Sequence, residues 1–213
     1  MKSSMLLIRH GQVDSPMGST GPLMYGSQQP LNKIGEQQMT KLGESFNAQG
    51  LTPQIIYTSP FPRAVQSAQI LSNELPNHPR VIIRDNLRGG FSPQWDGRLV
   101  SELANVKEDI FSKNPYQPDI HGETLQEAYA RVTQEYQQLL DTNPESTIAM
   151  VTHGEIVSII RHYEKTDDKN KAGLDQPIGK AEALLIQRNN EGTILKQQLI
   201  TSEFQSNPVE MKK

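Results

Sequence analysis

The stretch LLIRHG, residues 6–11, is an apolar run that ends on Arg9 and His10 and then stops at a glycine. A second stretch, IAMVTHGE at residues 148–155, has the same form and ends on His153. Short apolar runs bounded by a glycine are typical of buried strands. The chain therefore predicts two strands that each carry a histidine at the carboxyl end, and these two strands anchor the predicted sheet.

A third apolar run, IIYT at residues 55–58, leads into SPFPRAVQSAQIL and places Arg63 directly after Pro62. Proline is favoured in the first turn of a helix, so Arg63 is expected just inside one. Ligands of open α/β sheets bind beyond the carboxyl ends of the strands. One cationic pocket, suited to a phosphate, is therefore expected from the residues at these ends: Arg9, His10, Arg63 and His153.

Strand-like and helical patterns alternate along most of the chain. Strands are expected at four apolar runs: residues 5–8, 54–57, 81–83 and 147–151. Helices are expected between and after them, over about 32–49, 62–75, 124–140 and 155–163. This alternation indicates an α/β fold with parallel strand pairing. Near the C-terminus, residues 183–188 and 194–200 flank NNEG, which predicts a hairpin and an antiparallel portion of the sheet.

The composition limits the classes of protein to which the chain can belong. Its 213 residues carry a net charge of −3 and a mean hydropathy of −0.59, with 35% hydrophobic residues. These values suit a single domain over residues 1–213 with a flexible tail at 204–213, and they give no basic character toward nucleic acid. The absence of cysteine excludes disulfides, thiolate metal sites and a cysteine nucleophile. No apolar run suits a signal peptide or a membrane span, so the expected location is cytoplasmic, with no membrane partner.

The chemistry of the predicted pocket follows from its side chains. A neutral imidazole can attack phosphorus and later leave, so His10 is the candidate nucleophile. The two arginines would hold phosphate oxygens through forked, charge-assisted hydrogen bonds. His153 would stabilise the charge of the transferring group. Unpaired N–H groups at the start of a helix add to the attraction for an anion.

The chain resembles the histidine phosphatase superfamily, in its phosphoglycerate-mutase-like branch, from about residue 5 to residue 200. LLIRHGQ is similar to the opening strand and catalytic signature of that family, and VTHGEIV to its second histidine signature. PLNKIGEQQ, YTSPFPRAVQSAQIL and GETLQEAYARV resemble three segments that lie between the signatures. The second of these segments has Ser67 where the family usually has threonine.

The resemblance implies a three-layer α/β/α sandwich and a phosphohistidine intermediate on His10. It implies that Arg9, Arg63 and His153 complete the phosphate pocket, with Gly154 beside them as a substrate-binding residue. No metal and no organic cofactor is needed by the phosphatase members of the family. Mutase members require a phosphorylated primer, which donates its phosphate to the histidine.

One departure from the family pattern concerns the proton donor. The family has a glutamate in a segment for which this chain has DNLRGGFSPQWDGR, residues 85–98, and Gly89 stands in its place. A positioned acid is worth ~10²–10⁴-fold in rate, and glycine has no proton to give. The stretch 85–97 is expected to be a loop. The carboxylates that could substitute are Asp96, Glu102, Glu123 and Glu155, of which Glu123 is favoured, or there is no donor at all.

The sequence thus predicts a phosphatase that acts on a phosphomonoester or a phosphoramidate. The substrate would be a phosphorylated small molecule or a phosphoprotein, and the protein a monomer or a homodimer. The alternative is a module of low turnover that binds or senses a phosphorylated ligand on the same fold. A phosphoglycerate mutase is less favoured, because the glutamate is missing and the stretch between residues 97 and 121 is short for a substrate lid.

Overall fold

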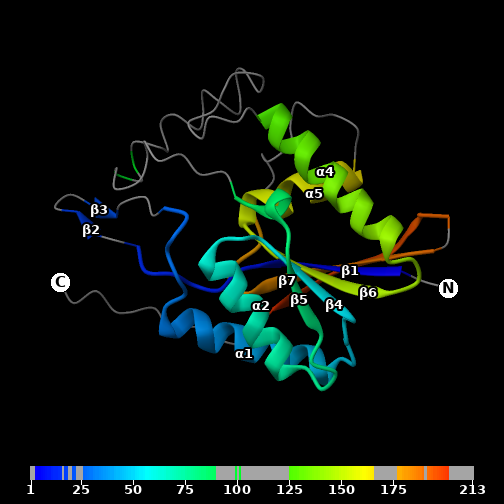
Figure 1. Cartoon of the computed structure of the whole chain (residues 1–213), viewed down its shortest axis with the longest axis horizontal. Helices are drawn as coiled ribbons and strands as arrows, with labels where there is room; N and C mark the ends of the chain where they lie inside the picture. Colours follow the sequence, from blue (N-terminus) through cyan, green and yellow to red (C-terminus); the bar gives the residue numbers. More distant parts are fainter. Residues whose placement is uncertain are drawn as a thin grey trace.

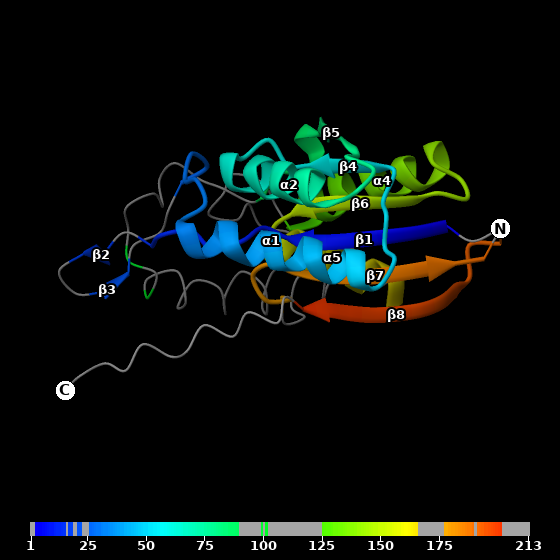
Figure 2. The ribbon, with the colours of Figure 1, turned by 90° about the horizontal axis from the view of Figure 1, so that it is seen from below.

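The computed structural model describes residues 3–15, 17–18, 21–22, 26–89, 99, 101, 125–165, 177–189 and 191–201. Over these residues the main sheet has the strand order β5-β4-β6-β1-β7-β8, and Figure 2 shows its strands side by side. The strands are β1 (Ser3–Arg9), β4 (Ile55–Thr58), β5 (Arg80–Ile83), β6 (Thr147–Thr152), β7 (Glu182–Arg188) and β8 (Ile194–Thr201). Two short strands, β2 (Met17–Gly18) and β3 (Gly21–Pro22), pair separately.

The sheet is mixed in the way that the sequence predicts. Strands β1, β4, β5 and β6 are parallel to one another. Strand β7 is antiparallel to both of its neighbours, β1 and β8. The carboxyl ends of β1, β4 and β6 therefore lie at one edge of the sheet, and the amino end of β7 joins them there (Figure 1).

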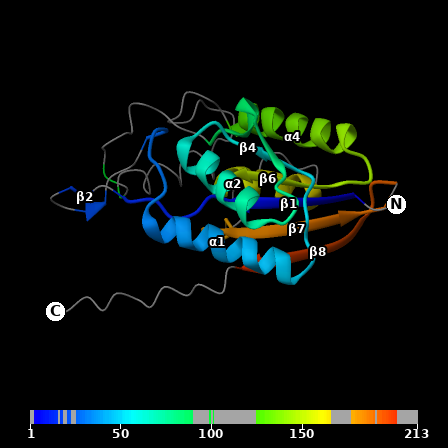
Figure 3. The same cartoon turned by 60° about the horizontal axis from the view of Figure 1, so that its bottom comes forward.

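Helices cover both faces of the sheet. They are α1 (Lys33–Ala48), α2 (Pro62–Glu74), α4 (Leu125–Thr142) and α5 (Gly154–Lys165), close to the predicted ranges. Helices α1 and α2 lie against one face and α4 and α5 against the other (Figure 1), and Figure 3 shows α1 and α2 side by side. The expected three-layer α/β/α arrangement is confirmed.

Alternation along β1 explains why there are two hydrophobic cores. Successive strand residues point to opposite faces, so Met5 and Leu7 pack with α4 and α5. Leu6 and Ile8 pack with α1 and α2 on the other side. All four side chains are at most 1% exposed. An apolar run without alternation, such as the one that precedes Arg9, is what a strand buried on both faces requires.

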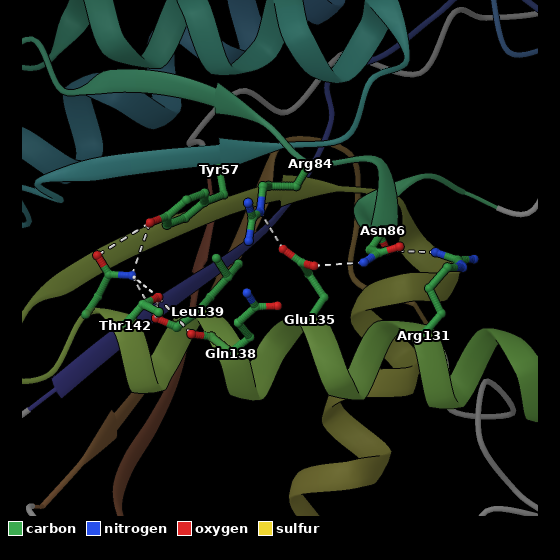
Figure 4. Close-up of polar contacts among 9 residues, drawn as sticks. Tyr57, Arg84, Asn86, Arg131, Glu135, Gln138, Leu139 and Thr142 are labelled. Atoms are coloured by element: carbon green, nitrogen blue, oxygen red, sulfur yellow. Dashed lines mark hydrogen bonds and ion pairs between the residues drawn. The ribbon is translucent and has the colours of Figure 1, made fainter.

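The segment after β5 differs from its prediction. Residues 85–87 form a short 3₁₀-helix, η1 (Asp85–Leu87), where a loop was expected. Buried Glu135 of α4 orders this turn, because its carboxylate accepts hydrogen bonds from Arg84 Nε at 2.6 Å and Asn86 Nδ2 at 2.9 Å (Figure 4). Residues 90–97 of the predicted loop and the predicted tail at 204–213 lie outside the described residues. Over the part of the chain that is described, no helix is long and apolar enough to cross a membrane.

Candidate active site

The register of the sheet brings the two histidines together. Arg9 of β1 lies opposite Thr152 of β6, and the next residue of each strand is a histidine. His10 N–H donates to the Thr152 carbonyl at 2.9 Å, which closes the ladder at this point. The rings of His10 and His153 meet edge-to-face with centroids 5.1 Å apart. Both are almost fully buried, with exposed fractions of 3% and 2%.

The orientation of His10 leaves one ring nitrogen available as a nucleophile. Its Nδ1 lies 2.7 Å from the carbonyl oxygen of Gly11. A carbonyl only accepts hydrogen bonds, so Nδ1 carries the proton and Nε2 carries the lone pair. Burial lowers the pKa of His10 well below its usual value, and the charges of Lys180, Arg63 and Arg9 act in the same direction. The imidazole is therefore neutral at neutral pH, as attack on phosphorus requires.

His153 is held by the loop that follows β4. Its Nε2 lies 2.8 Å from Ser59 Oγ, and the Phe61 ring packs edge-on against it at 5.1 Å. Burial, followed by the charges of its basic neighbours, lowers the pKa of His153 well below its usual value. A second neutral imidazole thus lies beside the nucleophile, in a fixed orientation.

Arg63 lies in the first turn of α2, as predicted. Its guanidinium is over the Phe61 ring, with Cζ 4.9 Å from the centroid, and its Nη1 donates to the Gly26 carbonyl at 3.0 Å. Ser67 ties this helix to β1: its hydroxyl donates to the Arg63 carbonyl at 2.7 Å and accepts from Gly11 N–H at 3.1 Å. A hydroxyl without the methyl group of threonine is enough for this bridge.

Arg9 extends from the end of β1 over the start of α5. Its Nη1 donates to the Ile178 carbonyl at 2.8 Å. A Cβ on Gly154 would lie 3.1 Å from both Nε and Cζ of Arg9, so a side chain there would push the guanidinium aside by a few tenths of an ångström. Within the described residues, the buried Arg9 Nε has no hydrogen-bond partner. That donor is therefore available to an anion.

The structure thus brings together the histidine–arginine cluster, defined as Arg9, His10, Arg63 and His153, with Gly154 beside it. Two contributors were missed from the sequence, Ser59 and Lys180. Ser59 is a hydroxyl directly after a strand, in a segment already singled out, and its position was a usable signal. Lys180 precedes β7, and nothing in its own surroundings in the sequence marks it.

Lys180 reaches the cluster because β7 runs antiparallel to β1. The adjacent Ala181 N–H donates to the carbonyls of Arg9 at 3.1 Å and His10 at 3.3 Å. Burial, with the charges of Arg9 and Arg63, lowers the pKa of Lys180 to about 7, although the charge of Glu155 acts in the opposite direction. Lys180 is therefore close to half-charged at neutral pH, and a bound anion would favour its charged form.

Gly89 lies directly against His153. A Cβ on Gly89 would be 2.7 Å from Glu155 Oε1 and 2.9 Å from His153 Cγ, and the backbone of Gly89 does not have a positive φ. Space, rather than backbone conformation, therefore requires glycine here. Of the four candidate proton donors, Glu155 is described, in the first turn of α5 with an exposed side chain. Glu123, Asp96 and Glu102 lie outside the described residues.

A metal site has no support in the described part of the chain, where no three histidine, aspartate or glutamate residues form a group that could hold an ion. The groups that converge on the site are imidazoles, guanidiniums and one ammonium. They suit an anion held by hydrogen bonds and charge.

Comparisons with known proteins agree with this geometry. The model of the histidine phosphatase superfamily (branch 1) matches residues 5–198. A 2,3-bisphosphoglycerate-dependent phosphoglycerate mutase of Corynebacterium kroppenstedtii is 25% identical over 207 residues, covering 82% of each chain. An Entamoeba histolytica phosphoserine phosphatase superposes with a TM-score of 0.71 at 18% identity, covering 92% of this chain and 96% of that one. A mycobacterial glucosyl-3-phosphoglycerate phosphatase superposes with a TM-score of 0.72 at 19% sequence identity, covering 93% of this chain and 97% of that one.

Proposed function

Because the chain belongs to branch 1 of the histidine phosphatase superfamily, we propose that it is a phosphatase that forms a phosphohistidine on His10. The observation that carries the proposal is the state of His10. Its Nδ1 proton is directed to the Gly11 carbonyl, its Nε2 lone pair is available, and its depressed pKa keeps the ring neutral.

The reaction would proceed in two displacements. The His10 Nε2 lone pair attacks phosphorus, the P–N bond forms, and the P–O bond to the leaving group breaks with its electrons on oxygen. Arg9, Arg63 and His153 hold the phosphoryl oxygens and offset their charge as the transfer proceeds. Water then attacks the phosphohistidine, the P–N bond breaks, and its electrons return to Nε2.

Hydrolysis is favoured over mutase activity for this chain. The mutase relative is 25% identical, which supports common ancestry but does not carry its substrate across. The phosphatases among the structural neighbours support a hydrolase of the same fold. The substrate class is a phosphomonoester or a phosphoramidate. A cytoplasmic location and a monomeric or dimeric state stay predictions of the sequence.

The intermediate can be trapped by rapid quench with a labelled aryl phosphate. The adduct should be labile in acid and stable in base, and it should disappear in His10→Asn. His78→Asn is a matched control, because His78 is an exposed histidine on the α2–β5 connection and has a positive φ that asparagine tolerates. Label retained by His10→Asn would refute the assignment of the nucleophile.

The same experiment separates the phosphatase from the two alternatives. A mutase would need a phosphorylated primer, so steady release of inorganic phosphate without any primer favours the hydrolase. A binding module of low turnover would bind tungstate, a phosphate mimic, without releasing phosphate from any ester. Tungstate affinity measured by calorimetry therefore accompanies the turnover assay.

A further inference from the structure

The side of the site beside Gly89 holds a carboxylate that comes from another element. Glu155 lies two residues after His153, at the start of α5. Its Oε1 would lie 2.7 Å from a Cβ at residue 89. The same Cβ position is 2.9–3.0 Å from two atoms of the His153 ring. The Glu155 carboxylate is thus adjacent to the inner surface of the site, although it starts from the helix.

The backbone that carries Gly89 is fixed on two sides. Thr152 Oγ1 donates to the Leu87 carbonyl at 2.7 Å, which ties the turn to the end of β6. Arg131 Nη1 donates to the Asn86 carbonyl at 2.7 Å (Figure 4) and to the Arg88 carbonyl at 3.2 Å, and these bonds tie the turn to α4. Because both anchors are adjacent to Gly89, its close approach to His153 and Glu155 is a built feature of the site.

Glu155 also interacts with the ammonium that enters from β7. Its charge raises the pKa of Lys180, against the larger effects of burial and of the two arginines. Among the described residues, the Glu155 carboxylate therefore acts on Lys180 together with the guanidiniums of Arg9 and Arg63. The described part of the site thus has an acidic group on the side of His153 that faces Gly89.

We propose that Glu155 is the proton donor for the leaving group, in place of the side chain that Gly89 lacks. The proposal rests on the proposed function and deepens it, because it assigns the acid of the same reaction. It predicts that the enzyme acts on alkyl phosphates, whose poor leaving groups need a proton, as well as on aryl and acyl phosphates.

The proton balance is simple. As the P–O bond breaks, the carboxylic acid of Glu155 gives its proton to the departing oxygen, so that an alcohol and a carboxylate result. In the second displacement the carboxylate takes a proton from the attacking water, while the P–N bond breaks and its electrons return to His10. Glu155 thereby ends in its starting form.

A carboxylate in the first turn of a helix is also favoured by the helix dipole alone, so the test needs a matched control. Glu36 supplies it, because Glu36 is an exposed first-turn glutamate of α1 and contacts none of the proposed catalytic residues. Glu36→Gln removes the same charge from the first turn of another helix. Any effect of Glu155→Gln that Glu36→Gln shares is a helix effect.

The experiment compares propyl phosphate with 2,4-dinitrophenyl phosphate, whose leaving group needs no proton. Glu155→Gln should lower kcat for propyl phosphate about 100-fold or more and change kcat for the dinitrophenyl ester by less than about threefold. Glu155→Asp should recover part of the loss, and Glu36→Gln should affect neither substrate. Formation of the His10 adduct from the dinitrophenyl ester should survive in Glu155→Gln.

Three results would overturn the assignment. Equal losses with both esters would make Glu155 a positioning residue for His153. Selective loss in Lys180→Met instead of Glu155→Gln would make the lysine the donor. A wild type that hydrolyses only the dinitrophenyl ester would mean that no acid acts. None of these removes the adduct on His10, whereas failure of the phosphatase mechanism itself would leave no adduct in any variant.

Discussion

On the phosphate-binding side of the candidate site, His10, His153 and Arg63 are almost fully buried and tied to three strands, whereas on the leaving-group side Glu155 is exposed and Gly89 has no side chain. In the proposed reaction, the first side recognises the same phosphoryl group in every substrate. The second side accommodates whatever group leaves. The contrast teaches that groups which bind an invariant part of a ligand can be buried in the core, while groups that face a variable part of it are left at the surface.

The largest effect should come from breaking the buried side. Arg63→Ala removes a charged hydrogen bond to the anion, which is worth about 1.5–3 kcal/mol, or ~10–150-fold in tungstate affinity. Arg80→Ala is the control, because Arg80 is exposed on β5. Calorimetry gives the affinity of each variant. Equal tungstate affinities in Arg63→Ala and the wild type would place anion binding elsewhere.

The boundary between the two sides is tested by Gly89→Ala. The new methyl group would lie 2.9 Å from Cγ of a ring that is buried and bonded to Ser59, so the ring must shift. A misplaced catalytic group of this kind should lower kcat/KM about tenfold or more for aryl and alkyl phosphates alike. Unchanged kcat/KM for both esters would show that the His153 ring can move away from the new methyl group without loss of function.

Lys180 sharpens the comparison through pH. The pKa of Lys180 is about 7 in the free protein, so below pH 7 a dianion binds to a lysine that is already charged. Above pH 7 the lysine must take up a proton from solvent when the dianion binds. Tungstate affinity should therefore be level from about pH 6 to about pH 7 and fall by up to about tenfold per unit above it. Tungstate keeps its charge over this range, and Lys180→Met should flatten the profile.

The smallest effect is expected at Ser59, which supports His153 from behind. Ser59→Ala removes one hydrogen bond to the ring, worth about 1 kcal/mol or ~5-fold in kcat. Ser72→Ala is a matched control, because the Ser72 hydroxyl is also buried and donates to the Pro79 carbonyl at 2.7 Å. Both variants should lose similar stability in thermal denaturation. If kcat falls as far in Ser72→Ala as in Ser59→Ala, the decrease reflects lost stability and not lost support of His153.

The sequence was enough to predict the sheet, the helices and the histidine–arginine cluster, because each cluster residue directly follows an apolar run or a helix-starting proline. Lys180 was missed for a physical reason. The cluster residues follow the carboxyl ends of parallel strands, whereas the antiparallel β7 brings its amino end to the same edge. The hairpin predicted at residues 183–200 already implied an antiparallel strand, and therefore an amino end, at this edge of the sheet.

The sequence favoured Glu123 as proton donor, and it gave no sign that Glu155 lies beside Gly89. The two residues of interest, Gly89 and Glu155, are far apart in the sequence, and their contact depends on the turn η1 and its bonds to Glu135 and Thr152. Glu135 lies in no motif, and the signature that contains Thr152 does not indicate its bond to the turn. A side chain that acts from a neighbouring helix is visible only once the backbone between them is placed.

The pairing of Arg9 with Thr152 also has a mechanical meaning. A slip of β1 against β6 by one residue would turn Leu7 and Ile8 to the opposite layers and, in the same step, move His10 out of line with His153. The distance between the nucleophile and its partner is therefore set by the same interlocking that fills both cores. Turnover should accordingly vanish and return together with the fold, so that catalytic activity serves as a gauge of correct strand alignment during refolding.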